Sequence, residues 1–380
     1  METNAIANSP GLARKLLYVL AAFSGLPFLT VMSLLAFINV NKADNLFEVS
    51  VLETTLSIVY AIVPALILVT TLIWHWQDLK ARKSGSQIPN EQLMYYCLVA
   101  CRYSLAAIII FYGLDKLMVN QLHSSYYWYG DELGDLSGFQ LTWSFFGYSK
   151  LYNSFIAVAQ VLGGTLLLFK RTTLIGALLL LPILGNIALI DFNYDIPAKD
   201  IISVLLLLDI FLVSISLRPL WEFFVLNKTV DAQRIIAPYS IGKKKYSPKL
   251  KSIALSALIL FVFMTNFKQM KNDNSSPIEG AWRADSVQNF TDSAPEKNKK
   301  LTLKWFVDGK VVTVKKTYQY EDFNLALDEP TMNMLSLQSI RDSLHQHDIR
   351  GTYTLVNNRL QFRGREGADS VYWVFSKASR

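Results

Sequence analysis

Seven stretches of apolar residues, each close to the length needed to cross a lipid bilayer, occupy the first two-thirds of the chain. A helix rises about 1.5 Å per residue, so about 20 apolar residues cross a hydrocarbon core of about 30 Å. We therefore predict a polytopic membrane protein with seven transmembrane helices. The stretches are residues 16–40, 51–74, 93–117, 151–169, 172–192, 201–226 and 252–267.

Charged residues are scarce up to about residue 267 and ordinary after it. About 13% of residues 1–267 are charged, against about 27% of residues 268–380. Soluble domains carry about 25%, so the first part has too little charge to cover a water-exposed surface of its size. A single soluble domain, a disordered chain and a fibrous protein are excluded, and a membrane bundle with a small globular tail remains.

The basic residues cluster at the ends of the apolar stretches. Basic residues that flank membrane spans account for the net charge of +7. The lipid bilayer is therefore the expected partner, and no nucleic acid is expected. With the N-terminus in the cytoplasm, the inner segments carry fifteen Lys and Arg and the short outer loops carry three. That asymmetry predicts a cytoplasmic N-terminus, a basic cytoplasmic linker at 229–251 and, if 252–267 spans, a tail on the outer side.

Ionisable residues inside the apolar stretches are costly and predict a buried polar site. Counted from the helix ends, Arg102 and Asp209 lie at nearly the same depth, and Gln160 lies near mid-height of the fourth stretch. We call these three residues the midplane cluster and predict that Arg102 pairs with Asp209, because an unpaired charge there costs far more than a paired one. The cluster is either a polar contact for a substrate or quinone, or a clamp between helices.

A second polar group marks the outer ends of the predicted helices. It suits a polar headgroup or proton handling, and it suits a structural salt-bridge network equally well. Between the third and fourth stretches, the outer loop adds nine aromatic residues in 126–148, which fit an interfacial belt or a lid over a site. The outer-mouth cluster comprises Asp115, Lys116, Asp191, Asp195 and Lys199.

Small residues predict where helices approach closely. Gly163, Gly164, Gly176 and Gly185 fall in the fourth and fifth stretches, which a tight turn at 170–173 joins as a hairpin. Cys97 and Cys101 lie on one helix face, where small buried hydrophobes are favoured over a redox pair. Neither the cysteines nor the histidines are spaced as metal ligands, so no metal site is predicted.

The tail changes to the alternating pattern of β-strands after a polar linker at 271–277. Asp308–Gly309 and Asn357–Asn358 predict two-residue hairpin turns, and a short helix is expected within 330–347. About eight short strands in 278–380 predict a small barrel or sandwich. The Gly280-Ala-Trp282 opening resembles that of lipocalin-like domains, which implies a barrel that either holds a small apolar ligand or is filled by its own side chains.

Four motifs occur in order along the middle of the chain: RYSLA (102–106), YGLDKL (112–117), QVLGGTLLLFKRTTLIGA (160–177) and YDIPAK (194–199). Together they resemble the DoxX-like family of bacterial membrane proteins over about residues 93–228. The resemblance implies a four-helix membrane module, a location in the bacterial inner membrane and a link to quinone-coupled sulfur oxidation or oxidative-stress complexes. The family commonly has Glu where this chain has Gln160, so a proton-carrying role at that position is not carried over.

The predicted architecture is two N-terminal helices in 1–92, a DoxX-like module in 93–228, the linker, a seventh helix at 252–267 and a periplasmic β domain in 278–380. Three functions follow as alternatives. The protein is an accessory component of a membrane redox or stress system that handles a quinone or lipid and has a membrane redox partner. In the second alternative, the protein is a quinone-linked oxidoreductase. In the third, it is a carrier whose β domain receives a lipid or small molecule.

Overall fold

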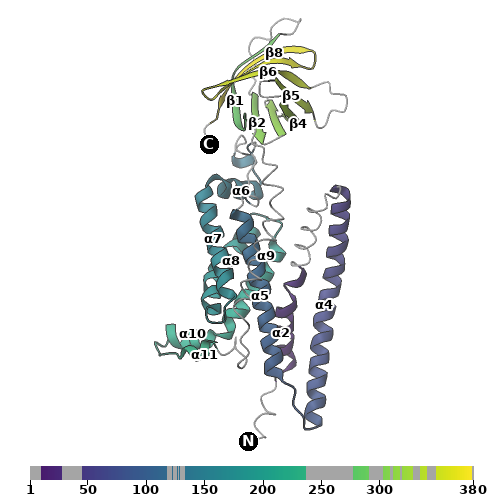
Figure 1. The fold of residues 1–380 in the computed structure, drawn as a ribbon, viewed down its shortest axis with the longest axis vertical. Coiled ribbons are helices and arrows are strands. Elements are labelled where there is room, and N and C mark those ends of the chain that lie inside the picture. The colour runs from purple at the N-terminus through teal and green to yellow at the C-terminus, as the bar shows by residue number, and fades with distance from the viewer. Residues whose placement is uncertain are drawn as a thin grey trace. The chain divides into compact units, whose positions relative to one another are not determined.

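The computed structural model describes residues 10–27, 45–117, 122, 126, 128, 133–236, 277–290, 303–308, 311–316, 319–327, 334–339 and 348–378. The chain divides into two compact units (Figure 1). The helical unit comprises Met1–Leu122 and Ser149–Phe267, and the second unit comprises His123–Tyr148 and Lys268–Arg380. The segment between the third and fourth predicted spans therefore groups with the β domain.

The described part of the helical unit contains long helices joined by short turns. α7 and α8 form the predicted hairpin, since only five residues separate Leu167 from Thr173. The helices are α2 (Leu12–Phe23), α4 (Asn45–Lys83), α5 (Asn90–Leu117), α7 (Lys150–Leu167), α8 (Thr173–Asn193), α9 (Lys199–Ile215), α10 (Leu217–Phe224) and α11 (Ala232–Ile236).

Three helical segments in the described residues are long and apolar enough to cross a membrane. They are Ser57–Lys83 of α4, α5 and α8, and α9 with α10 makes a fourth if that bent pair counts as one span. The prediction of seven transmembrane helices is not supported. α7 is long enough but not apolar enough, because Lys150, Asn153 and Gln160 lower its mean hydropathy. The predicted span at 252–267 and residues 28–40 of the first lie outside the described residues.

The predicted sixth span at 201–226 is broken. α9 ends at Ile215, and α10 continues at 66° to it. Pro219 explains the break, because a proline ring clashes with the carbonyl four residues earlier, here that of Ile215, and has no N–H to donate. The stretch is therefore one helix that enters the bundle and a second, separate helix.

Glycines bring the helices of the bundle together. A Cβ on Gly164 would lie 2.8 Å from Ile110 of α5, and one on Gly176 would lie 2.9 Å from the Gly163 carbonyl oxygen of α7. These contacts confirm close approach at Gly163, Gly164 and Gly176. Gly185 has no atom within 4 Å of its Cβ position, so the prediction is wrong there.

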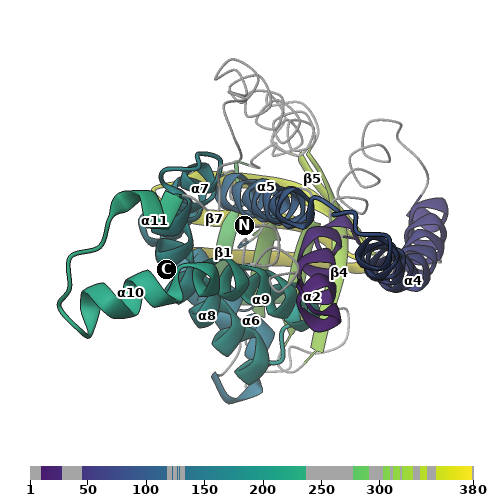
Figure 2. The same cartoon turned by 90° about the horizontal axis from the view of Figure 1, so that it is seen from below.

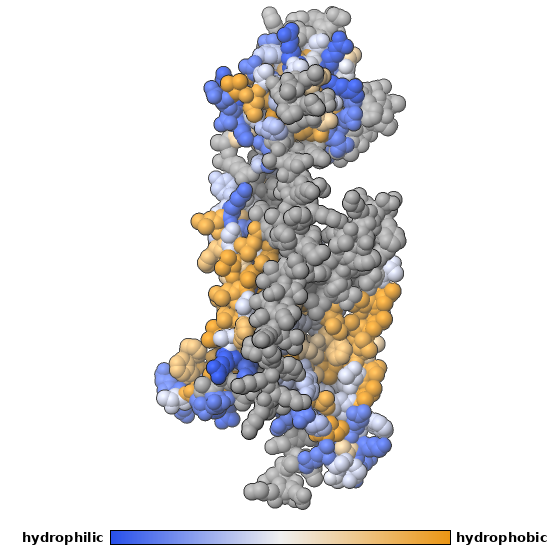
Figure 3. Space-filling view, viewed as in Figure 1, coloured by the Kyte–Doolittle hydropathy of each residue, from blue (hydrophilic) through white to orange (hydrophobic). Residues whose placement is uncertain are grey.

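Large apolar side chains cover much of the described outer surface of the helical unit (Figure 3). Leu72 of α4, Leu151 of α7 and Leu189 of α8 are 58%, 83% and 66% exposed. Soluble monomers rarely expose contiguous apolar patches of more than a few hundred Å², so this surface suits contact with lipid tails.

The β domain is a closed barrel of eight antiparallel strands, in which each strand pairs with the next and β1 pairs with β8. Closure leaves no unpaired sheet edge. The predicted choice between barrel and sandwich is thereby decided in favour of the barrel. The strands are β1 (Gly280–Phe290), β2 (Leu303–Asp308), β3 (Val311–Lys316), β4 (Gln319–Leu327), β5 (Met334–Ser339), β6 (Ile349–Val356), β7 (Arg359–Glu366) and β8 (Asp369–Lys377).

Both predicted hairpins are present, but the first turn is one residue later than predicted, because Asp308 belongs to β2 and pairs with Val311. β6 and β7 are joined by Asn357 and Asn358, whose φ values of 49° and 60° are those that a type I′ turn requires. β2 and β3 pair on either side of residues 309–310, which lie outside the described residues. The helix predicted within 330–347 is wrong at Met334–Ser339, because these residues form β5 with alternating burial of Leu335 and Leu337.

Aromatic rings occupy the described barrel interior. Trp305 lies 4.7 Å from Phe375, 5.5 Å from Phe362 and 5.6 Å from Trp373, measured between ring centroids. The side chains of Trp282 and Phe323 are also at most 1% exposed. This packing favours the filled barrel over the open one.

The close approach of α7 and α8 makes a testable prediction. Gly176→Ala should lower the free energy of unfolding by about 1–3 kcal/mol, because the added methyl group meets backbone atoms that cannot move aside. Gly185→Ala, in the same helix, is the matched control and should leave stability unchanged or slightly raised. Thermal unfolding in detergent measures both, and equal melting temperatures for the two variants would refute the assigned packing.

Candidate functional site

Arg102 of the midplane cluster points to the start of α8. Its Nη1 donates a 3.3 Å hydrogen bond to Thr173 Oγ1, and its guanidinium lies 4.9 Å from the centroid of the Tyr103 ring. The side chain is only 3% exposed, and its Nε has no hydrogen-bond partner. Arg102 is thus held at the α7–α8 turn.

Asp209 of α9 is fully buried, and neither of its carboxylate oxygens has a hydrogen-bond partner. It lies close enough to the Cys101 thiol to interact electrostatically with it. Cys101 and Arg102 are adjacent in α5, so Asp209 is near Arg102 in depth but meets a different face of the helix. The predicted ion pair between Arg102 and Asp209 is therefore not formed.

Gln160 of α7 lies away from Arg102 and not close by as predicted, because its neighbour Val161 packs against Gly113, about 16 Å along α5 from Arg102. The Gln160 side chain is 2% exposed, and its Oε1 has no hydrogen-bond partner. Among the described residues, the three side chains leave four buried polar atoms without a hydrogen-bond partner, at two levels of the bundle: Arg102 Nε and both Asp209 oxygens at one level, and Gln160 Oε1 at the other. In an apolar bundle such atoms cost roughly 1–3 kcal/mol each or more, so the arrangement favours a bound polar group.

The outer-mouth cluster is partly assembled. Lys116 is 9% exposed and Asp191 is 6% exposed. The carboxylates of Asp115 and Asp191 both attract the Lys116 ammonium. The ammonium also lies 5.4 Å from the centroid of the Tyr112 ring. Asn153 of α7 joins this group by donating a 3.4 Å hydrogen bond to the Lys116 carbonyl oxygen. Sequence reasoning missed Asn153, although it is a polar residue inside an apolar stretch.

Asp195 and Lys199 form a separate ion pair in the turn between α8 and α9. The Lys199 ammonium donates a hydrogen bond to the Asp195 carboxylate and its positive charge stabilises that anion, so the pKa of the Asp195 carboxyl lies below its ordinary value. Asp195 is 92% exposed, so this pair is a surface contact that solvent screens and that adds little to stability. It stabilises the turn and presents no enclosed binding site.

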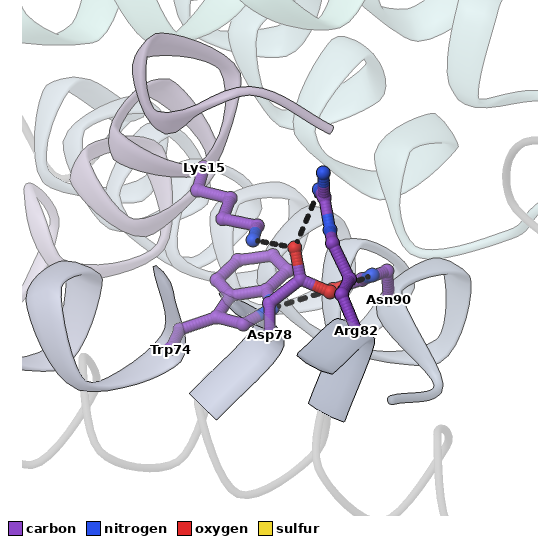
Figure 4. Close-up of polar contacts among 5 residues, drawn as sticks. All are labelled: Lys15, Trp74, Asp78, Arg82 and Asn90. Atoms are coloured by element: carbon purple, nitrogen blue, oxygen red, sulfur yellow. Dashed lines mark hydrogen bonds and ion pairs between the residues drawn. The ribbon is translucent and has the colours of Figure 1, made fainter. Parts of the chain in front are cut away.

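A third polar group, which the sequence did not predict, lies where α2, α4 and the start of α5 meet (Figure 4). Lys15 Nζ is 2.6 Å and Arg82 Nη2 is 2.8 Å from Asp78 Oδ2. Asn90 Nδ2 donates to Asp78 Oδ1, and Trp74 Nε1 donates to Asn90 Oδ1. We call these five residues the Asp78 network.

The Asp78 network is a structural clamp. Lys15 is fully buried and Asp78 is 2% exposed, and every carboxylate oxygen of Asp78 is hydrogen-bonded. Buried charges that are paired and hydrogen-bonded hold elements in one register. In the sequence, Asp78 stands next to the basic run Lys80–Lys83. A basic run at a helix end indicates which side of the membrane that end faces, and it does not show that Asp78 pairs with Lys15.

The aromatic segment before α7 belongs to the same unit as the barrel. It includes α6 (Gly138–Tyr148), where Phe139 and Trp143 stack with ring centroids 4.0 Å apart. Tyr126 Oη lies 3.4 Å from Glu279 Oε1, just before β1. Phe145 is 64% exposed. These contacts tie the segment to the start of the barrel, and both interpretations of its aromatic residues, belt or lid, stay predictions.

The fold and the buried polar groups define a helical protein with several candidate membrane spans and an appended β-barrel. No family model matches the chain, and no solved structure matches it. Over 140 residues, 36% of the chain, it is 30% identical to the uncharacterized protein YwoB of Bacillus subtilis (strain 168) and covers 86% of that protein. The chain therefore belongs to the family of YwoB. Since YwoB is uncharacterized, this relationship assigns no activity.

Breaking the Asp78 network should destabilise the helical unit. Asp78→Leu leaves the Lys15 ammonium buried without a counter-charge and should lower the free energy of unfolding by about 3–5 kcal/mol. The double variant Lys15→Met with Asp78→Leu should recover much of that loss. Lys80→Met, at an exposed position of the same helix, is the control. Thermal unfolding in detergent that leaves Asp78→Leu as stable as the wild type would contradict the clamp.

Proposed function

We propose that the protein is an integral protein of the bacterial inner membrane, of DoxX-like type, which binds the polar head of a quinone or lipid inside its helical bundle. The cytoplasmic N-terminus and periplasmic barrel follow from the distribution of basic residues. A membrane redox or stress system is the setting that the DoxX-like resemblance suggests.

One observation carries the proposal: among the residues that the structure describes, neither carboxylate oxygen of the buried Asp209 has a hydrogen-bond partner. Asp209, Gln160 and Arg102 are all at least 97% buried. A hydroxyl of a quinol or lipid would donate a hydrogen bond to Asp209, and a quinone carbonyl would accept one from Arg102 Nε, which lies near the same depth. Apolar tails suit the leucine-rich surroundings of these groups.

The contrast with the Asp78 network supports a ligand in this place. Both polar groups are buried in the same helical unit, but every oxygen of Asp78 is hydrogen-bonded and neither oxygen of Asp209 is. If Asp209 had a purely structural role, protein groups would be expected to donate hydrogen bonds to its oxygens, as they do to those of Asp78. The barrel offers less room, because aromatic side chains fill its described interior.

The test uses the full chain in lipid nanodiscs and two probes, a short-chain ubiquinone and a fluorescent phosphatidylglycerol. Asp209→Leu should weaken binding of one probe at least about tenfold, which corresponds to about 1.4 kcal/mol. The same variant should unfold at an equal or higher temperature, because an unpaired buried carboxylate is replaced by an apolar group. Binding isotherms and melting curves measure the two effects.

Leu207→Ala, on the same helix at a 64% exposed position, is the matched control and should leave binding unchanged. The probe that responds distinguishes a quinone site from a lipid site. Equal binding by wild type and Asp209→Leu, or no binding of either probe to the wild type, would overturn the proposal.

A further inference from the structure

α10 is an exposed amphipathic helix, and no described part of the chain covers its apolar side. Leu217, Trp221 and Phe224 fall on one face, at spacings of four and three residues, and are 58%, 57% and 69% exposed. Val225 and Leu226 extend this apolar face beyond the helix, at 49% and 47% exposure. We call this set the α10 apolar face.

The bend before α10 sets its direction. α10 runs at 66° to α9, so it turns away from the axis of the bundle helix that precedes it. Figures 1 and 2 show α10 and α11 projecting sideways from α8 and α9 at one end of the helical unit. A helix at this angle to a membrane span lies much closer to the membrane plane than to its normal.

The polar side of α10 is held by a three-residue ion-pair network. Arg218 Nε lies 3.1 Å from Glu222 Oε1, and Arg234 Nη1 of the α11 segment lies 2.7 Å from Glu222 Oε2. Glu222 is therefore neutralised by two guanidinium groups. The network fixes α11 against the polar side of α10 and leaves the apolar face open.

The charge of this region suits an anionic surface. Residues 217–251 contain eight Lys and Arg against two acidic residues, of which Glu222 is the neutralised one. Amphipathic helices with Trp and Phe on one face and basic residues on the other bury the apolar face about 5–10 Å into the boundary between headgroups and acyl chains. Each basic residue near an anionic membrane surface adds about 1 kcal/mol.

We propose that α10 lies in the plane of the membrane and anchors this end of the bundle to anionic phospholipid headgroups. The proposal rests on the proposed membrane insertion of α5, α8 and α9. Trp221 and Phe224 enter the headgroup–acyl boundary. Arg218 on the polar side of α10 faces the headgroups, and the ion pair between Glu222 and Arg234 keeps α11 on the aqueous side.

The experiment measures the depth of spin labels on the full chain with both native cysteines replaced by alanine. Single labels at Phe224→Cys, Lys228→Cys and Leu189→Cys are compared in vesicles of phosphatidylcholine with and without phosphatidylglycerol. Collisions with oxygen and with a neutral nickel chelate give the depth. The label at 224 should lie about 5–10 Å below the headgroups in anionic vesicles and shallower in neutral ones, and the label at 228 should meet the chelate.

Leu189 is 66% exposed on α8 and serves as the reference for membrane insertion. A label at 224 that meets the chelate as freely as 228, with 189 in the hydrocarbon, would overturn the α10 proposal alone. Chelate access at 189 would overturn membrane insertion itself. The anionic-surface assignment would also be overturned if the label at 224 lay at the same depth in both lipid mixtures. Spin–spin broadening at 224 from a second copy would overturn it as well.

Discussion

A polar group enclosed in an apolar bundle must find its hydrogen-bond partner inside the protein or in a bound molecule, and this constraint organises the helical unit. Where lipid tails replace water, an unsatisfied group costs several kcal/mol. The Asp78 network meets the constraint within the chain, because Lys15, Arg82 and Asn90 all contact one carboxylate. Asp209 does not, and this difference separates a structural carboxylate from a candidate ligand contact.

The glycine contacts explain how the polar groups come to be enclosed. Close approach of α5, α7 and α8 at Gly164 and Gly176 leaves no room for water between the helices there. Ile109, Leu180 and Leu212 are completely buried around the same levels of the bundle. The β-barrel is built differently: closure pairs the edges of its sheet, and tilted and edge-on Trp and Phe rings fill its described interior, where Trp305 Nε1 has no hydrogen-bond partner among the described residues. The two units thus present different surfaces, one apolar and one charged (Figure 3).

The sequence predicted the local structure well and the tertiary contacts poorly. Apolar length located α4, α5 and α8, and the Asn357–Asn358 turn and strand alternation located the barrel hairpins. Pro219 was visible in the sequence, but apolar length alone does not reveal the break that it causes. The Arg102–Asp209 pair failed because counting residues gives the depth of a side chain and not the helix face on which it lies. The Asp78 network was missed for the related reason that its members are up to 75 residues apart, and only packing brings them together.

The most direct test of the account is a high-resolution experimental structure of the full chain purified in lipid nanodiscs. The account predicts elongated non-protein density whose polar end lies within about 2.5–3.2 Å of an Asp209 carboxylate oxygen. A structure in which both oxygens of Asp209 are hydrogen-bonded only to protein groups or to water would contradict it.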